Sequence, residues 1–431
     1  MVAINPLQSL LQKAIDAQQT ALAGGLRFLD LGDHPAAANY RTAIGELSGA
    51  IWVDAAGKTA SPARTSVHTS SAPIFLGGAH KSGTTLLRNL LDGHPEISVL
   101  PTDGFGLRFH RKISRFEPEQ RGPAMVAAAV ANLAMPIAGE SPRWILGDTI
   151  EPYLKIGVIL RELSGCGTLT DTPSCMRGFA DLFQRLSPQK NPVRYWAEKS
   201  TFNVQDAPLL APLFPNGKFI HIVRHPGAIV AAQKRKQPMK ERSFCLQREC
   251  EEVFSSLAAG IRNQRTLPAG SYHLVNYEQL LSNPDKEMRR ICTFLGVGFD
   301  ECLLKPTVFG QPAGSNTSRL KSSVAGRLHT APGEKWRSEL TTDQLDLIRF
   351  CFRRILRACN YDEIFSPRDH WKGAARAIKA HMDGSDQPAR ALVRWIALAL
   401  KGWLPPMVRR RRRFSQSCAR FSVNPKPLTS S

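Results

Sequence analysis

The sequence lacks the cysteine patterns that would mark a metal centre or a disulfide framework. Its nine cysteines are irregularly spaced, without a Cys-x2-Cys pair and without a His/Cys cluster at zinc-ligand spacing. Neither a structural zinc site nor a disulfide-rich secreted fold is therefore expected. The odd number and the spacing instead favour reduced thiols in a cytosolic protein, many of them in the core.

Long apolar runs are also missing. No uninterrupted apolar stretch approaches the ~20 residues that a helix needs to cross a bilayer. The first residues show no basic segment followed by an apolar run, so no signal peptide is expected. Together these absences predict a cytoplasmic location.

Acidic residues are scarce beside basic ones. The 431 residues include 57 Lys and Arg against 36 Asp and Glu, which gives a formal net charge of +21. Such a charge indicates an anionic cofactor, an acidic substrate, a membrane surface or nucleic acid, although a solvated basic surface without a partner gives the same composition. The length predicts one catalytic domain with appendages.

One segment has the pattern of a strand, a glycine-bearing loop and a helix. Ile74 to Leu76 indicate a short buried strand, Gly77 to Gly83 the loop, and Thr84 the start of the helix. Loop N–H groups and a helix N-terminus together bind phosphate. A Walker A loop would carry lysine at position 84, whereas the lysine here is Lys81. The loop therefore predicts a phosphorylated donor other than a nucleoside triphosphate.

The pattern from residue 73 to about residue 367 predicts an α/β fold. Apolar strands alternate with helical patterns, which is typical of a P-loop-like three-layer domain with a central parallel sheet. The strands are expected at residues 74–76, 194–199, 218–223 and 272–277. Functional groups in such sheets gather at the carboxyl ends of strands, where the glycine loop, Lys199, Arg224 and Tyr277 all fall.

The two ends of the chain differ from this central region. Residues 1–55 are expected to form a helical hairpin that is helical from about 5 to 50 with a turn at 32–35, and residues 56–72 a linker. Residues 368–431 form a basic tail, predicted to contain a helix and to end in five arginines at 409–413. The helix is expected to place these apolar side chains on one face: Leu392, Trp395, Ile396, Ala399 and Trp403.

A basic amphipathic helix followed by a polybasic run fits attachment to a membrane surface. Residues 388–413 therefore predict binding to an anionic membrane, peripheral at the inner membrane. A helix packed on the core and followed by a basic tail would have the same pattern.

Arg224 follows directly after a predicted buried strand. Burying a guanidinium group without a partner is unfavourable, so an anion is expected beside it. A phosphate would serve, because guanidinium binds phosphate through two parallel hydrogen bonds.

Five segments in chain order resemble sulfotransferases. Residues 77–87 resemble their 5′-phosphosulfate loop and residues 220–231 their 3′-phosphate strand and helix. Further matching pieces are Trp-Ala-Glu-Lys-Ser at 196–200, Val-Asn-Tyr-Glu-Gln-Leu at 275–280 and Lys-Trp-Arg at 335–337. The resemblance covers roughly residues 73 to 350 and is of the bacterial type similar to tyrosylprotein sulfotransferases.

The resemblance implies the donor 3′-phosphoadenosine 5′-phosphosulfate (PAPS) and transfer of its sulfuryl group to a hydroxyl, without a metal. A tyrosine, a lipid, a glycan and a small metabolite all stay open as acceptors. The implied donor-binding residues are Lys81, Ser82, Gly83, Thr84, Thr85, Arg224, Lys236, Tyr277, Ser322 and Lys335. Lys199 and Lys81 would stabilise the charge of the transferring group. A surface lysine at 199 and a core tyrosine at 277 are the alternatives.

The sequence departs from the family pattern at two places. Ala232 stands where the family usually has a serine for the 3′-phosphate, a loss that Lys236 would offset. Thr102 stands where the tyrosylprotein branch has an acidic pair. Asp103 is then the nearby carboxylate, either as the general base or as a helix N-cap, with His110 a lesser candidate base.

Two other functions compete with this interpretation. A P-loop kinase or other nucleoside triphosphate enzyme would need lysine at position 84 and a Walker B acid, and neither is evident. A non-enzymatic module that binds membrane or nucleic acid through the basic tail is the second alternative, although no specific nucleic-acid motif is present.

Overall fold

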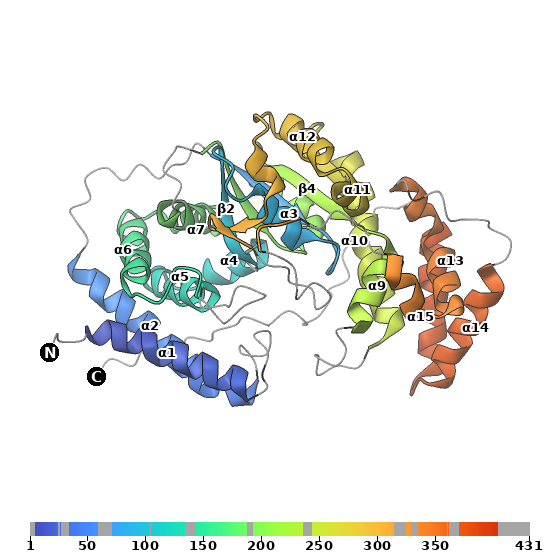
Figure 1. The fold of residues 1–431 in the computed structure, drawn as a ribbon, viewed down its shortest axis with the longest axis horizontal. Coiled ribbons are helices and arrows are strands. Elements are labelled where there is room, and N and C mark those ends of the chain that lie inside the picture. Colours follow the sequence, from blue (N-terminus) through green and yellow to red (C-terminus); the bar gives the residue numbers. More distant parts are fainter. Residues whose placement is uncertain are drawn as a thin grey trace.

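The computed structural model has a parallel sheet at its centre and helical layers around it (Figure 1). It describes residues 5–24, 26, 34–58, 71–103, 105–133, 144–187, 193–235, 244–313, 325–328, 334–359, 361 and 370–403, without the side chains of 334–335, 370 and 401–403. The strands are β1 (Ala72–Gly77), β2 (Ile97–Asp103), β3 (Tyr195–Lys199), β4 (Lys218–Val223), β5 (Tyr272–Asn276), β6 (Thr307–Val308) and β7 (Gln311–Pro312).

The helices flank the sheet and extend beyond it at both ends. Those before β4 are α1 (Pro6–Ala23), α2 (Ala38–Asp54), α3 (Thr84–Leu91), α4 (Leu107–Ile113), α5 (Pro118–Leu133), α6 (Glu151–Gly165), α7 (Thr172–Leu186) and α8 (Asn203–Leu210). Those after β4 are α9 (Pro226–Arg235), α10 (Leu246–Thr266), α11 (Tyr277–Ser282), α12 (Pro284–Leu295), α13 (Thr342–Ala358), α14 (His370–Asp383) and α15 (Pro388–Trp403). Short 3-10 turns include η4 (Glu301–Leu304) and η6 (Glu334–Glu339).

The predicted α/β fold is confirmed. The five main strands are all parallel and run in the order β2-β3-β1-β4-β5. Strand β1 pairs with β3 on one side and β4 on the other, so the chain changes direction across the sheet at β1. The crevice at the carboxyl end of such a strand is where parallel sheets bind ligands.

Strand β2 was missed by the sequence analysis, and its proline explains why. Pro101 lacks the N–H that a central strand needs for its ladder, which argues against a strand. The structure places β2 at the edge of the sheet, where it pairs with β3 alone. The pairing register shifts between Val99 and Asp103, around the proline, so the edge strand accommodates it.

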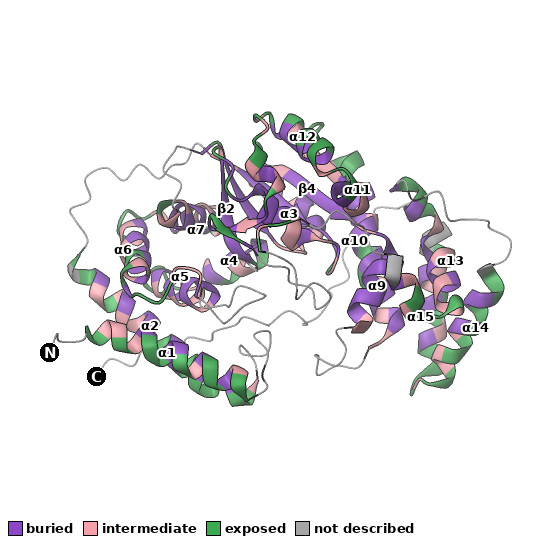
Figure 2. Cartoon of the chain, in the orientation of Figure 1, coloured by how far each residue is buried: buried purple, intermediate pink, exposed green. Residues whose placement is uncertain are grey.

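The two faces of the sheet have separate cores because alternate side chains of a strand point to opposite faces. Phe75 of β1 packs with Trp196 and Phe219 in the cluster that includes α5, α6 and α7. Its neighbours Ile74 and Leu76 belong to the cluster under α3 and α12. Strands β1, β3 and β4 are mostly buried, as Figure 2 shows for the central sheet and as expected for strands covered on both faces.

The N-terminal helices pack on the domain and share its core. Buried residues of α1 and α2 belong to the same cluster as α5 and α6. Trp144 Nε1 donates a hydrogen bond of 3.2 Å to Gln18, and Arg161 Nε donates one of 2.7 Å to the carbonyl of Trp52. Helix α1 ends at Ala23. Of the expected turn at 32–35, residues 32 and 33 lie outside the described residues, and His34 is the N-cap of a 3-10 turn at Pro35–Ala37.

The C-terminal helices also pack on the core. Trp395 is completely buried in the cluster of α9, α10 and α13, and Gln247 donates a hydrogen bond of 2.9 Å to the carbonyl of Ala391. Only part of the predicted apolar face is covered, because Trp395 is buried whereas Ile396 is exposed. Of the described helices, none is both long enough and apolar enough to span a bilayer.

Truncating Trp395 should destabilise the whole protein and not the last helix alone. Trp395→Ala removes a fully buried indole, so we expect the free energy of unfolding to fall by about 3–5 kcal/mol. Ile396→Ala, at the neighbouring exposed position, should change it by less than about 1 kcal/mol. Urea unfolding followed by fluorescence and circular dichroism measures both. Similar losses in the two variants would contradict the packing of α15 on the core.

Candidate active site

The glycine loop joins β1 to α3 in a conformation that only glycine adopts easily. Gly83 is the N-cap residue of α3 and has a φ of 103°. A Cβ atom there would overlap the ring of Tyr277, so the loop needs glycine for its backbone and for its packing. Because Gly83 has no capping side chain, the first N–H groups of α3 remain available to an anion.

Ser82 is the strongest sign of a ligand in this loop. The residue is completely buried, and its Oγ atom has no hydrogen-bond partner. Buried hydroxyl groups are nearly always hydrogen-bonded in folded proteins. A buried hydroxyl without a partner next to a helix N-terminus can therefore form a hydrogen bond with a ligand. An anionic oxygen bound at the start of α3 would satisfy it.

Arg224 reaches the same loop from the end of β4. Its Nη1 atom donates a hydrogen bond of 2.9 Å to the carbonyl oxygen of Lys81, and its guanidinium lies 4.4 Å from the ring centre of Tyr277. Its Nε is buried without a partner. Lys81 itself has a φ of 73°, a left-handed conformation that costs a side-chain-bearing residue about 1–3 kcal/mol. Such strain is typical of functional loops.

Lys199 and Asp103 meet at the ends of the neighbouring strands β3 and β2. The Lys199 ammonium forms an ion pair with Asp103 Oδ2, and Arg88 Nη1 of α3 pairs with Asp103 Oδ1 at 2.9 Å. The Lys199 side chain is only 5% exposed, whereas that of Asp103 is 51% exposed. The alternative of a surface lysine is therefore wrong, and the shared carboxylate is open to a second molecule.

The charges in this cluster influence one another. Burial disfavours ionisation of Asp103, but the cationic Lys199 and Arg88 outweigh it and hold the pKa of the carboxyl below its usual range. Burial lowers the pKa of Lys199, and the Asp103 carboxylate opposes that shift. Asp103 is consequently ionised at neutral pH.

Glu198 lies on β3 beside Lys199 and is completely buried. Burial raises the pKa of Glu198 to about 8, against the opposing hydrogen bond from Asn203. Asn203 Nδ2 donates to Glu198 Oε2 at 2.7 Å and to the carbonyl of Leu76 at 3.0 Å. The amide therefore ties the end of β3 to the end of β1, while the second oxygen of Glu198 has no partner.

The structure brings together most of the predicted site residues. The loop from Lys81 to Thr85, Arg224 and Tyr277 are in mutual contact, and Lys199 lies with Asp103 on the neighbouring strands. Tyr277 is half-buried against the loop and begins α11.

Three other predicted site residues do not belong to these contacts. Lys236 and Ser322 lie outside the described residues. Lys335 is in η6, and the next residue, Trp336, packs against His225 with ring centres 4.6 Å apart. The segment around 335 thus lies against the residue that follows Arg224.

Two subsidiary predictions are corrected by the structure. Asp103 is not a helix N-cap, because α4 begins after Gly106, which is the N-cap residue. His110 is enclosed by Phe109 and Phe179, and burial lowers its pKa to about 3. An imidazole that is buried among aromatic rings cannot reach an acceptor.

Sequence reasoning missed Arg88 and Asn203. Arg88 follows Leu86 and Leu87 on the helix and is itself buried, yet an arginine in a short helix looks like a solvent-facing residue. Its position one turn after Thr84, facing the sheet, was the available signal, because a buried guanidinium needs an anion. The sequence around Asn203 gives no comparable indication of its role.

Comparison with known proteins agrees with this geometry. The model of the sulfotransferase family matches residues 73–301, which include the glycine loop, Lys199, Arg224 and Tyr277. The chain belongs to the sulfotransferase family. The matched residues contain β1 to β5, apart from the first residue of β1, and the loops at the carboxyl ends of these strands.

The sulfotransferase chain is similar to several curated proteins. Protein-tyrosine sulfotransferase 2 of Gallus gallus is 28% identical over 261 residues, which cover 58% of each chain. Protein-tyrosine sulfotransferase 1 of Danio rerio is 25% identical over 254 residues, covering 58% of this chain and 61% of that one. The chain thus spans about three fifths of the length of these relatives.

Among solved structures, the sulfotransferase domain of the Synechococcus PCC 7002 olefin synthase is similar to this chain. The TM-score is 0.42 at 22% sequence identity, and the alignment covers 68% of this chain and 96% of that domain.

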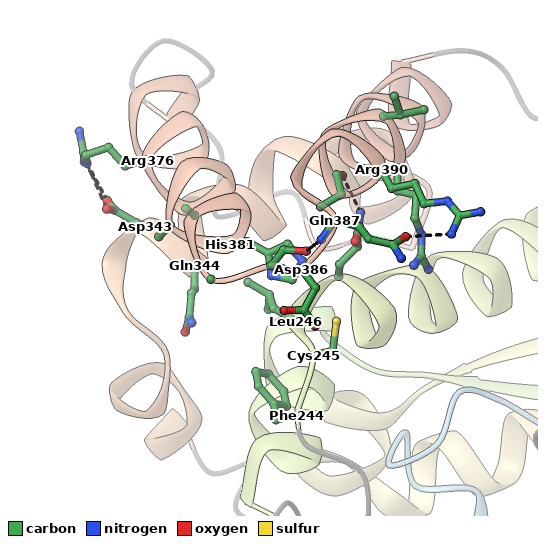
Figure 3. A pocket seen from close by; sticks show the side chains of 18 of the residues that line it. Phe244, Cys245, Leu246, Asp343, Gln344, Arg376, His381, Asp386, Gln387 and Arg390 are labelled. Atoms are coloured by element: carbon green, nitrogen blue, oxygen red, sulfur yellow. Dashed lines mark hydrogen bonds and ion pairs between the residues drawn. The ribbon is translucent and has the colours of Figure 1, made fainter.

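A separate cavity of about 1180 Å³ opens between α10, α13, α14 and α15 (Figure 3). Its lining includes His381 and the arginines at 376, 390 and 394. None of the donor-site residues that the structure describes borders it. Its size therefore says nothing about the donor site at the end of β1.

Replacing Glu198 by glutamine should change how stability depends on pH. With a folded-state pKa of about 8, Glu198 keeps a proton that the unfolded chain loses near its ordinary pKa, so the folded state binds more protons between the two values. The contribution of Glu198 to stability should then fall as pH rises, by about 1.4 kcal/mol per pH unit between about pH 5 and pH 8.

Glu198→Gln lacks this contribution while it still accepts from Asn203. We expect the variant to match the wild type near pH 5 and to exceed it increasingly towards pH 8 in urea unfolding. Glu301→Gln, at an exposed position, is the matched control and should follow the wild type. Parallel curves for wild type and Glu198→Gln would mean that Glu198 is ionised in the folded protein.

Proposed function

We propose that this protein transfers a sulfuryl group from PAPS to an acceptor hydroxyl. The family match supports this activity, and one structural observation is the main argument for it. The buried, partnerless hydroxyl of Ser82 lies at the start of α3, in the loop that Arg224 contacts. An anion-binding loop with two more cationic side chains at adjacent strand ends suits a donor with phosphate at both ends.

The donor would bind along the carboxyl ends of β1 and β4. Ser82, Gly83, Thr84 and Thr85 would donate N–H and hydroxyl hydrogen bonds to the 5′-phosphosulfate. Arg224 is already held by the carbonyl of Lys81 and by Tyr277, and its buried Nε lacks a partner. That atom would donate to the 3′-phosphate.

Sulfuryl transfer would proceed by in-line attack. The acceptor oxygen forms a bond to sulfur while the bond from sulfur to the phosphate oxygen breaks, leaving 3′-phosphoadenosine 5′-phosphate. Lys199 and Lys81 would stabilise the charge that builds on the phosphate. The proton of the acceptor would pass to Asp103, whose carboxylate is ionised and half-exposed.

The acceptor is proposed only as a hydroxyl. The relatives are named as protein-tyrosine sulfotransferases, which supports a tyrosine, and a lipid, a glycan and a small metabolite stay open. For location we propose the cytoplasm, peripheral at the inner membrane. Burial of five of the eight described free cysteines as thiols supports a reducing compartment.

Calorimetry separates this proposal from a nucleoside triphosphate enzyme. We expect 3′-phosphoadenosine 5′-phosphate to bind more tightly than ATP, because Arg224 has a phosphate to pair with only in the former. Arg224→Ala should weaken the bisphosphate by about ten- to a hundredfold, the loss of one or two charged hydrogen bonds.

The control ligand is 5′-AMP, which lacks the 3′-phosphate, and its affinity should change little in Arg224→Ala. Equal losses for both ligands would mean that Arg224 acts by shaping the loop through Lys81. ATP binding as tight as the bisphosphate would contradict the sulfotransferase proposal itself.

The role of Asp103 can be tested through its partner Arg88. Asp103→Asn should lower kcat by about a hundredfold or more if the carboxylate takes the proton. Arg88→Gln keeps the carboxylate but removes one of the cations that hold its pKa down, so the acidic limb of the pH–rate profile should move to higher pH. Transfer from radiolabelled donor to a model phenol measures both.

Arg88→Lys is the matched control, since it preserves the charge, and its acidic limb should stay near that of the wild type. An unchanged acidic limb in Arg88→Gln, or a change in the KM for the donor alone in Asp103→Asn, would make Asp103 a positioning residue for Lys199.

A further inference from the structure

Helix α15 carries a second apolar face that the core does not cover. Val393, Ile396 and Leu400 are 64%, 48% and 54% exposed. Spacings of three and four residues place them on one side of the helix, here called the outer ridge. Trp395 and Leu398 point the other way, into the core. The helix is thus buried on one side and carries exposed apolar side chains on the other. Figure 2 shows buried and exposed residues alternating along α15.

This exposure is concentrated in one part of the described chain. The large apolar side chains that are strongly exposed are Val53, Trp371, Val393, Ile396 and Leu400. Three of the five form the outer ridge, and Trp371 is on α14, which packs beside α15. Scattered apolar side chains on a surface need no explanation, but a row of aliphatic side chains on one helix marks an interaction surface.

The same region is the most basic part of the chain. Residues 370–431 contain thirteen Lys and Arg against two Asp, which accounts for +11 of the net charge of +21. Arg390 is exposed at the start of α15 and donates a hydrogen bond of 2.8 Å to the neutral side chain of Gln387, and Lys372 and Lys379 are exposed on α14. Arg394 is half-exposed although it pairs with Glu251.

We propose that the outer ridge docks on the surface of an anionic lipid bilayer. Val393, Ile396 and Leu400 would enter the boundary between headgroups and acyl chains, with α15 parallel to the membrane plane. The exposed basic side chains of α14 and α15 would bind anionic headgroups. An apolar ridge with basic flanks is complementary to such a surface in both respects.

Other occupants fit the ridge less well. Nucleic acid would complement the positive charge but would not form favourable contacts with a row of exposed aliphatic side chains. A second copy of this chain would cover the ridge but would bring two strongly basic regions together. The docking surface is separate from the donor site, because no residue of the glycine loop, Lys199 or Arg224 belongs to it.

Vesicle co-sedimentation of the full chain tests the proposal. Vesicles of phosphatidylcholine mixed with phosphatidylglycerol should bind the wild type, and phosphatidylcholine alone should bind it much less. The triple variant Val393→Gln, Ile396→Gln, Leu400→Gln should partition at least about tenfold more weakly, because three apolar side chains no longer leave water. Glutamine keeps the helix propensity.

Val53→Gln is the matched control, since it changes an equally exposed aliphatic residue on α2, and its binding should equal that of the wild type. Affinity for 3′-phosphoadenosine 5′-phosphate should be the same in all these proteins, which shows that they are folded and keeps this test separate from the proposed enzyme activity.

Three results would overturn the proposal. If the triple variant bound vesicles as strongly as the wild type, the charge of the tail alone would account for membrane binding. Equal binding to neutral and anionic vesicles would remove the role of the basic flanks. A wild-type dimer in light scattering that becomes monomeric in the triple variant, without loss of lipid binding, would assign the ridge to a second copy.

Discussion

The parallel pairing of β1 with β3 and β4 is the constraint on which the rest of the site depends. Parallel strands end at the same edge of a sheet, so residues that are more than a hundred positions apart in the sequence are brought to one crevice. The glycine loop follows the central strand, Lys199 ends the strand on one side, and Arg224 follows the strand on the other. The buried amide of Asn203 fastens two of these ends together.

Much of this arrangement could be predicted from the sequence, because the signals are local. The strand at 218–223 has the predicted bounds, and the loop is marked by its own glycines. Strand β2 was hidden by Pro101, which is tolerated only because the strand lies at the edge. Arg88 was hidden because its partner, Asp103, is on that missed strand. Pairing of distant charges is a property of topology, which residue patterns do not contain.

The C-terminal helix shows a different limit. Its apolar residues lie around more than half of the helix, and periodicity alone cannot say which of them the core will cover. The buried arc proved to centre on Trp395, whose ring centre lies 6.0 Å from that of His381 on α14 and which belongs to the cluster that includes α10 and α13. The remaining apolar residues were left outside. Residue patterns identify an amphipathic helix, whereas the shape of the surface below it decides which side faces inward.

The shared carboxylate of Asp103 has a consequence for ligand recognition. One negative charge serves two buried cations, so the cluster with Arg88 and Lys199 keeps a surplus of one positive charge before any ligand arrives. An incoming anion therefore competes with Asp103 for Lys199. When the anion binds, Lys199 exchanges its ion pair with Asp103 for an ion pair with the anion. The net gain is then the difference between two ion pairs, which is small for a weakly aligned anion. The cluster would consequently discriminate among anions more strongly than the number of its cationic side chains suggests.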